Sequence, residues 1–365
     1  MRILYAETTA YAPSSAHFLE ALEASAARDE HKFRFLDEAA FIKSARSIAG
    51  RIVNRVAGRA LSGYQQLNRA LVENAAAFSP EVILIGKGRW FTPTALKAAK
   101  EFSGATLVNW ATDDPFNRAD NSPEIVKSIP LYDLYLCTKK EIMSDVRRTG
   151  CANVVYVRFG YKPDVHFPEA PATNDERVRF ACDVMFAGGC DAHRAEYLEA
   201  LIRAMPDLKL HLYGGYWERE HALRPYARGF AIGRDYRLAV AGAKISANLV
   251  RHSNRDDHVM RTFEIPACGG FMLAERSSTH EELFSENNEA AFFSTHEEFV
   301  AKVRSYLARD EDRKRIAAAG YRKITRGAHT YGDRLAEIIR AAQSVRGSKR
   351  SAFGVSSSSE IESNG

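Results

Sequence analysis

The chain alternates short apolar runs with longer amphipathic stretches, and this alternation restricts its fold more than any other feature. Runs such as EVILIG (81–86) and TLVNWA (106–111) have the length and branched side chains of buried strands. Stretches between the runs, such as 60–77 and 93–102, have the length of helices. Strands that alternate with helices form parallel βαβ units, so the sequence predicts an α/β fold with doubly wound parallel sheets. The predicted strands are 2–6, 32–36, 81–86, 106–111, 135–138, 153–159, 184–189, 209–215, 243–249 and 270–274.

The length of the chain, 365 residues, exceeds the usual size of one domain and predicts two. A polar segment with several prolines, residues 161–176, lies between two halves of similar pattern and is the predicted hinge. The first domain is therefore predicted over 1–160 and the second, with terminal helices, over 177–345. Residues 346–365 are rich in serine and poor in apolar side chains, which predicts a disordered tail.

Composition excludes several classes of protein. Lys and Arg together number 51 against 46 Asp and Glu, an excess too small to indicate binding to nucleic acid. The five cysteines include no C-x-x-C pair, so we expect reduced thiols rather than a disulfide framework or a zinc site. The chain has neither a signal-peptide pattern at its start nor an apolar run of about 18 residues that could span a membrane. These features predict a cytoplasmic protein.

Glycine-rich loops follow two of the runs in the second half, and a parallel sheet binds ligands beyond the carboxyl ends of its strands. Gly188 and Gly189 let the backbone approach a ligand, and Arg194 adds a positive charge in the first turn of the next helix. The free N–H groups of that turn also attract anions, so these residues are candidates for binding a diphosphate. A plain glycine turn before a surface arginine explains the pattern equally well. Tyr213 and Gly214 repeat the arrangement and are candidates of the same kind.

The loop after the first predicted strand is polar but lacks the G-x-G-x-x-G pattern, which argues against a nicotinamide-dependent dehydrogenase. Thr9, Tyr11 and His17 lie in this loop or just after it, and Lys87 follows another predicted strand. These four residues are candidates for contacting an acceptor substrate.

The segment RTFEIPACGGFMLAE (261–275) predicts a short helix that ends at two glycines and leads into a strand. Arg261 and Glu264 lie one helical turn apart, where the arginine could neutralise a phosphate and the carboxylate could accept both hydroxyls of a ribose. Gly269 and Gly270 would keep the end of the helix slim against the sheet and the ligand. The alternative is a surface Arg–Glu pair capped by glycines.

Two further candidates for donor binding precede this helix. Asn248 lies in the predicted strand 243–249, and Asp256 lies eight residues before Glu264.

Several segments resemble one family. RTFEIPACGGFMLAE resembles the C-domain motif of GT-B glycosyltransferases of the "glycosyl transferases group 1" type, and the spore-maturation (CgeB-like) proteins are the most similar branch. In the related family 4 enzymes a Glu-x7-Glu motif binds the donor; Glu264 matches the second Glu, and the first falls on Asp256. RFGYKPDVHFP (158–168) and NWATDDPF (109–116) resemble the hinge and cleft segments of the same enzymes. The resemblance spans roughly residues 80–340.

The resemblance implies a GT-B fold, in which two Rossmann-like domains face a cleft and helices follow at the C-terminus. It also implies transfer of a sugar from a UDP-, GDP- or TDP-sugar to a surface glycan, a lipid-linked acceptor or a protein, with no obligatory metal or other cofactor. The donor would bind the C-terminal domain and the acceptor the N-terminal domain. Asp113 and Asp114 would be cleft residues, as a base or an acceptor contact, although an Asx turn before proline explains them as well. The Glu-x7-Glu likeness favours retention of the anomeric configuration over inversion.

A basic segment in the first half offers a different kind of surface. Arg51, Arg55 and Arg59 are spaced by four and would line one face of a helix. Such a face can contact an anionic membrane, here at its inner side, or hold an acidic acceptor. A solvated face of an ordinary helix is the alternative.

Two other functions fit the same architecture. A nucleotide-sugar 2-epimerase would call for paired acidic and histidine residues in the cleft, which the sequence alone does not place. A catalytically silent GT-B protein would only bind a nucleotide or a partner, and the Asp at position 256 keeps this alternative open.

Overall fold

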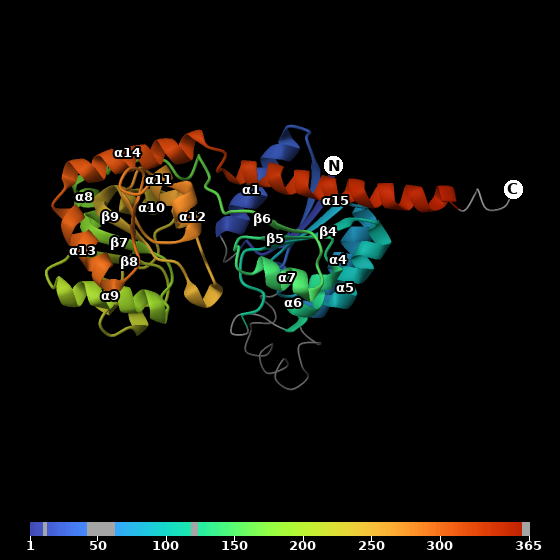
Figure 1. Ribbon diagram of the computed structural model, residues 1–365, viewed down its shortest axis with the longest axis horizontal. Coiled ribbons are helices and arrows are strands. Elements are labelled where there is room, and N and C mark those ends of the chain that lie inside the picture. Colours follow the sequence, from blue (N-terminus) through green and yellow to red (C-terminus); the bar gives the residue numbers. More distant parts are fainter. Residues whose placement is uncertain (10–12, 42–62, 118–122, 360–365) are drawn as a thin grey trace. The chain divides into compact units, whose positions relative to one another are not determined.

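The computed structural model describes residues 1–9, 13–41, 63–117 and 123–359 and falls into two units (Figure 1). The first unit comprises Met1–Arg158 together with Tyr331–Gly365, and the second comprises Phe159–Thr330. Each unit is built on one parallel sheet whose strands are connected by helices. This confirms the predicted fold class of doubly wound α/β units.

The sheet of the first unit has the strand order β2-β1-β3-β4-β5-β6, and every pairing in it is parallel. Its described elements are β1 (Arg2–Glu7), α1 (Pro13–Ala27), β2 (Lys32–Asp37), α4 (Gly63–Phe78), β3 (Val82–Gly86), α5 (Pro93–Ser103), β4 (Thr106–Ala111), α6 (Pro123–Ser128), the 3-10 turn η2 (Ile129–Leu131), β5 (Leu134–Cys137), α7 (Met143–Thr149), β6 (Val154–Tyr156) and α15 (Tyr331–Ser359).

Local sequence explains where these elements begin and end. The hydroxyl of Thr92 caps α5 by accepting the N–H of Ala95, and Pro93 occupies the first turn, where a missing N–H costs nothing. Gly104 ends the same helix with φ 65°, in the left-handed region that glycine adopts without strain. The helix is therefore bounded by residues suited to each end.

Both faces of the first sheet are covered. Alternate strand residues such as Ile83 and Leu107 pack with α4, α5 and α7 on one face, and their neighbours Leu84 and Val108 pack with α1 and α15 on the other. This period of two on fully buried strands is typical of a parallel sheet between helical layers.

The last helix corrects the predicted domain boundaries. The region 177–345 was expected to form one domain, but α15 packs its apolar side chains into the core of the first unit. The apolar stripe of α15, at one or two residues per turn, fits any parallel sheet, so the sequence alone does not decide which sheet it covers. Its core residues are Tyr331, Leu335, Ile338, Ile339 and Ala342.

The predicted disordered tail, residues 346–365, is also corrected, because α15 continues to Ser359. Arg346 pairs with Glu81 and fixes this part of the helix to the first unit. Residues 360–365 lie outside the described residues.

The sheet of the second unit has the strand order β11-β10-β9-β7-β8, again all parallel. Its described elements are α8 (Asn174–Phe180), β7 (Cys182–Ala187), α9 (Ala192–Ala204), β8 (Leu210–Tyr213), the 3-10 turns η3 (Trp217–Arg219) and η4 (Arg224–Tyr226), α10 (Arg234–Gly242), β9 (Ala243–Asn248), η5 (His252–Asn254), α11 (Arg261–Ala267), β10 (Met272–Glu275), α12 (Ser278–Leu283), β11 (Ala291–Phe293), α13 (His296–Leu307) and α14 (Asp310–Arg326). β11 was not predicted, since three residues are too few to show an alternation.

One face of the second sheet packs against α9 and α13 through residues such as Leu198 and Phe299. The other face packs against α8, α10, α11, α12 and α14. The sheet is thus covered on both sides, and its carboxyl edge is left as the place where loops meet.

The predicted hinge, residues 161–176, belongs to the second unit in the structure. Tyr161 forms a bridge with Thr330, and Glu169 pairs with both Arg234 and Arg237 at the start of α10. The charged residues of this segment favoured a solvent-exposed hinge in the sequence analysis. In the structure, the ion pairs of Glu169 with α10 hold the segment against the second unit.

No helix in the described part of the chain combines the length and apolar character needed to cross a membrane.

Candidate functional site

The carboxyl edge of the second sheet contains the point where the direction of strand addition reverses. β7 lies between β8 and β9, so the loops that follow β7 and β9 diverge from each other. Ligands of open parallel sheets bind at such a reversal. The predicted donor-binding residues of the second half lie on β8, β9, α9 and α11 and on the loops that follow β7, β8, β9 and α11.

Arg194 joins the two diverging loops. It lies in the first turn of α9, and its guanidinium donates to the carbonyl oxygens of Gly189 (3.0 Å) and Leu249 (3.2 Å). Asp191 caps the helix by accepting the N–H of Arg194 at 3.1 Å and lies 3.4 Å from its guanidinium. Burial lowers the pKa of Arg194. The guanidinium thus holds backbone carbonyls in place, a role different from the predicted contact with a diphosphate.

Glycines let the loops after β7 and β8 touch through their backbones. A Cβ atom on Gly214, whose φ is +129°, would lie 2.3 Å from the carbonyl oxygen of Gly188. By contrast, the nearest atom to a Cβ on Gly189 would be the oxygen of Gly215, at 3.9 Å. Gly189 therefore borders open space, as a residue beside a ligand would, while Gly214 is required by packing. Tyr213, at the end of β8, is buried, and its hydroxyl meets Nδ1 of His211 at 3.3 Å.

The two glycines after α11 serve packing as well. Gly269 has φ +77° and ends the helix in the left-handed conformation. A Cβ on Gly270 would lie 2.4 Å from Val240, so this position brings the end of the helix close to α10.

Arg261 and Glu264 form an ion pair at the same edge. Nε of Arg261 donates to the carbonyl oxygen of Ala187, the last residue of β7, and its guanidinium pairs with Glu264. Burial disfavours the charge of Arg261, but Glu264 outweighs this effect and raises its pKa. The Arg261 side chain is 24% exposed and that of Glu264 only 1%, with His166 3.5 Å from the carboxylate. Arg261 can thus meet an anion, while a ribose could reach Glu264 only by replacing one of its partners.

Asn248, another predicted donor contact, belongs to a buried network. Its amide donates to the hydroxyl of Thr262 (3.1 Å), which meets Nε2 of His280 at 2.8 Å, and Nδ1 of His280 meets the carbonyl oxygen of Glu275 at 2.7 Å. Burial lowers the pKa of His280 to about 4, so the ring is neutral. The network fastens α11 and α12 to β9 and β10.

Asp256 lies in the loop between η5 and α11. Its carboxylate accepts from the amide of Asn254 at 2.9 Å, and its charge acts on Arg194 to favour the protonated guanidinium.

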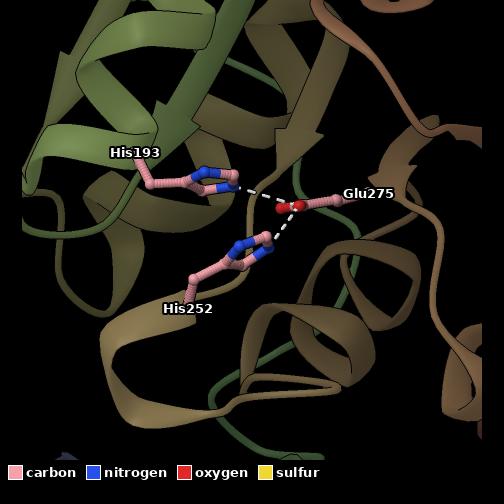
Figure 2. A group of neighbouring side chains, drawn as sticks. All are labelled: His193, His252 and Glu275. Atoms are coloured by element: carbon pink, nitrogen blue, oxygen red, sulfur yellow. Dashed lines mark hydrogen bonds and ion pairs between the residues drawn. The ribbon is translucent and has the colours of Figure 1, made fainter.

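Two histidines and a glutamate that were not predicted meet at this edge (Figure 2). Nε2 of His193, in the first turn of α9, lies 3.0 Å from Oε1 of Glu275, the last residue of β10. Nε2 of His252, at the start of η5, lies 2.6 Å from the same oxygen. The two imidazole rings stack with centroids 3.6 Å apart. We name these three residues the His–His–Glu cluster; His and Glu with this spacing can hold a metal ion.

A signal for this cluster was present in the sequence. Each of its residues lies at or just after the end of a predicted strand, and the three strands, β7, β9 and β10, are neighbours in the sheet. Polar side chains that follow neighbouring strands therefore indicate such a cluster in the sequence.

The first unit has its own cluster of charges at the reversal between β1 and β3. Lys87, with φ 54°, pairs with Asp113 at 3.1 Å. Burial opposes ionisation of Asp113, but Lys87 and Lys139 outweigh it and lower its pKa to about 2. Such a carboxylate is a weak base. Asp114 accepts the N–H of Phe116 at 2.9 Å, which is the Asx turn that the sequence left open as an alternative.

Glu7, at the end of β1, was not among the predicted bases. Its side chain is 1% exposed and packs against Gly86, and Oε1 accepts the N–H of Thr8 at 3.0 Å. Burial raises the pKa of Glu7 to about 7, although Lys87 and the Thr8 amide act in the opposite direction. Burial and the charge of Glu7 also raise the pKa of Glu38. A carboxyl group with a pKa near neutrality is suited to proton transfer.

The raised pKa of Glu7 predicts a pH-dependent stability. The folded state binds the proton more tightly than the unfolded chain, so ionisation of Glu7 costs stability as pH rises from about 4.5 to about 7. Glu7→Gln should therefore raise the free energy of unfolding by about 3 kcal/mol at pH 8 and by little at pH 4.5. Urea unfolding of both proteins at the two pH values measures this. Glu23→Gln, on an exposed position of α1, is the control; equal gains for Glu7→Gln at both pH values would contradict the assignment.

The remaining predicted residues have these positions. Thr9 is half-buried after β1, and His17 lies on α1, 3.5 Å from Glu20 and beside the ring of Tyr331. Tyr11 lies outside the described residues, as do Arg51, Arg55 and Arg59 of the predicted basic helix.

Residues 194–340 match a family described as glycosyl transferase-like. The match covers less than half of the chain and includes α11, β10 and two members of the His–His–Glu cluster, His252 and Glu275. No protein with curated annotation matches the chain.

Solved structures resemble the whole fold. HepE from Anabaena, in complex with UDP and glucose, has a TM-score of 0.65 and 13% identity over 94% of this chain and 100% of that chain. Sucrose-phosphate synthase from Thermosynechococcus elongatus has a TM-score of 0.65 and 12% identity over 97% of this chain and 100% of that chain. A glycosyltransferase from Rickettsia africae has a TM-score of 0.64 and 10% identity over 94% of this chain and 98% of that chain. The likeness confirms the predicted GT-B class of fold, with two Rossmann-like units.

Proposed function

We propose that this protein is a GT-B glycosyltransferase that moves a sugar from a nucleotide-sugar donor to an acceptor. The observation that carries the proposal is the glycosyl transferase-like match over 194–340, because this region supplies α11 and the loops after β9 and β10. The similar HepE structure contains UDP and glucose, which supports a UDP-sugar among the possible donors.

The donor diphosphate would lie at the carboxyl edge of the second sheet. Gly189 borders open space there, and the 13-residue helix α9 begins beside it, where the positive end of the helix dipole attracts anions. Arg261 would supply the positive charge, since its side chain is partly exposed and its guanidinium lies at the end of β7. The carboxylate of Glu264 would orient Arg261 and, where the ligand displaces a partner, accept a ribose hydroxyl.

The finer assignments follow from the sequence resemblance. They are a CgeB-like relative of family 4, retention of the anomeric configuration, no obligatory metal, and a glycan, lipid-linked or protein acceptor bound by the first unit. We also propose a cytoplasmic protein, with peripheral membrane contact through the basic segment. In the first unit, Glu7 would be a better base for an acceptor hydroxyl than Asp113, because its pKa is near 7 rather than near 2.

A nucleotide-sugar 2-epimerase is the second candidate. It calls for paired acidic and histidine residues, and the His–His–Glu cluster is such a set. This alternative predicts that a UDP-sugar is converted into its C2 epimer without any acceptor. The silent alternative predicts nucleotide binding with no turnover at all.

A thermal-shift screen against UDP, GDP, ADP, TDP and CMP, with and without EDTA, tests the proposal first. A nucleotide that binds only the folded protein stabilises it by about 2.7 kcal/mol at a hundredfold excess over its dissociation constant. We expect one nucleoside diphosphate to raise the melting temperature, and EDTA to leave the shift unchanged.

Release of that nucleoside diphosphate from its sugar conjugate is measured next, with product analysis for transfer, hydrolysis or epimerisation. If none of the nucleotides stabilises the protein, the proposed function is wrong. Epimerisation without transfer would favour the second candidate.

A further inference from the structure

We propose that His193, His252 and Glu275 form a binding site for a divalent transition-metal ion, with Zn²⁺ the ion that these donors fit best. The inference goes beyond the proposed function, because sugar transfer as proposed above requires no metal. It rests on the donor atoms, their spacing and the contacts that hold them in place.

The donor atoms converge on one point. Oε1 of Glu275 lies 3.0 Å from Nε2 of His193 and 2.6 Å from Nε2 of His252, and all three candidate ligand atoms lie within 4.8 Å of one another. Ligand atoms about 2.0–2.2 Å from a tetrahedral Zn²⁺ are separated by roughly 3.3 Å. The distances from Oε1 to the two imidazole nitrogens, 3.0 Å and 2.6 Å, are both shorter than this separation, so the carboxylate would move away from the rings to hold an ion in place of its two hydrogen bonds.

The backbone that carries these side chains is held in place from several sides. Arg194 binds Gly189 and Leu249 and so connects the loop before His193 with the loop before His252. The N–H of Val250 donates to Oε2 of Glu275 at 3.2 Å, which orients the carboxylate from the side opposite Oε1. Outer contacts of this kind fix the direction of a ligand and raise its affinity for the metal.

The chemistry of the set selects the class of ion. Two imidazoles and one carboxylate suit Zn²⁺ and its neighbours in the first transition row, whereas Mg²⁺ and Ca²⁺ prefer oxygen ligands alone. Three protein ligands leave the fourth position of a tetrahedral ion open, as in sites that admit water or a substrate. Solvent can reach this site, because the His252 side chain is 56% exposed. The buried Glu275, 7% exposed, supplies the negative charge.

The alternative is a clamp, in which both histidines donate to the carboxylate and no metal binds. The metal site and the clamp predict different results in a metal titration. A metal site takes up one ion per chain and loses it when a ligand is removed, and a clamp takes up none.

Isothermal titration of the metal-stripped full chain with Zn²⁺, without any nucleotide, tests the proposal. Titration with Co²⁺ adds a second readout, because a tetrahedral Co²⁺ site has intense visible absorption. We expect one ion per chain, and His252→Ala and Glu275→Gln should weaken binding by more than about 100-fold, since even a lost outer-shell partner costs about 10- to 100-fold. His221→Ala, an exposed histidine outside the cluster, is the matched control and should bind like the original protein.

His252 is largely exposed, so its variant should keep the fold, which circular dichroism and a urea midpoint check. Absence of saturable Zn²⁺ binding, or equal affinity in His252→Ala and the original protein, would overturn the metal site. Because nucleotide is left out, this result is independent of whether the donor-binding proposal holds.

Discussion

Glu264→Ala is expected to lower the free energy of unfolding by about 3–5 kcal/mol, the usual cost of removing one partner of a buried ion pair. Glu264 is 1% exposed and pairs with Arg261, whose charge it stabilises against burial. Without the carboxylate the guanidinium would remain largely enclosed over the ring of Tyr236, with its centre 4.5 Å from the ring centroid, and its main countercharge would be lost. Urea unfolding followed by circular dichroism measures the loss.

Two further variants sharpen this experiment. Glu199→Ala breaks an exposed pair with Arg203 on α9 and should cost less than about 1 kcal/mol. The double variant Arg261→Met/Glu264→Leu removes both charges and should recover much of the stability lost in Glu264→Ala, because an apolar pair needs no countercharge. A cost below 1 kcal/mol for Glu264→Ala would contradict the buried pair.

The double variant also separates stability from ligand binding. Burial of Glu264 makes the single variant Glu264→Ala ambiguous, because a loss of donor binding could result from unfolding alone. A folded Arg261→Met/Glu264→Leu protein that no longer responds to a nucleoside diphosphate would support the roles proposed for this pair. Unchanged affinity would exclude both residues from donor binding.

Gly214→Ala is expected to cost about 3 kcal/mol, by strain and by a backbone clash together. Its φ of +129° is one that alanine rarely adopts, and the added Cβ would lie 2.3 Å from the oxygen of Gly188. The oxygen belongs to the backbone, so it cannot rotate away as a side chain would. The loops after β7 and β8 would have to separate.

The adjacent glycine provides the control. A Cβ on Gly215 would meet Cζ of Phe230 at 3.6 Å, an ordinary contact, so Gly215→Ala should change the free energy of unfolding by at most about 0.5 kcal/mol. Urea midpoints of the two variants give the comparison. Similar values for both would show that the two loops are able to move apart without cost.

Much of the fold could be predicted because buried strands carry an unbroken apolar signal. Strands such as β3 and β4 lie within a residue of the runs that predicted them. The destination of α15 could not be predicted, since its apolar stripe would fit either sheet. The prediction of a disordered tail over residues 346–365 was wrong for a related reason. Arg346 pairs with Glu81, which lies 265 residues away in the sequence, so the sequence does not show that this part of the chain has a partner.

The candidate site shows the same division. The sequence indicated the right loops, because residues after parallel strands gather at one edge. The hydrogen bonds from Arg194 to two backbone carbonyl oxygens could not be predicted, because every residue has a carbonyl group and the sequence does not show which ones lie near the guanidinium. The His–His–Glu cluster was missed because His193 and Glu275 are 82 residues apart and only the neighbouring positions of β7, β9 and β10 bring them together.

The return of α15 to the first unit affects the order in which the protein folds during synthesis. The core of that unit contains Leu335 and Ile338, which emerge from the ribosome after the whole of Phe159–Thr330. The second unit is one continuous segment and can fold as soon as it has emerged, whereas one face of the first unit's sheet lacks α15 until synthesis ends. A truncated chain that ends at residue 330 should therefore have a protease-resistant second unit, whereas its first unit should be digested.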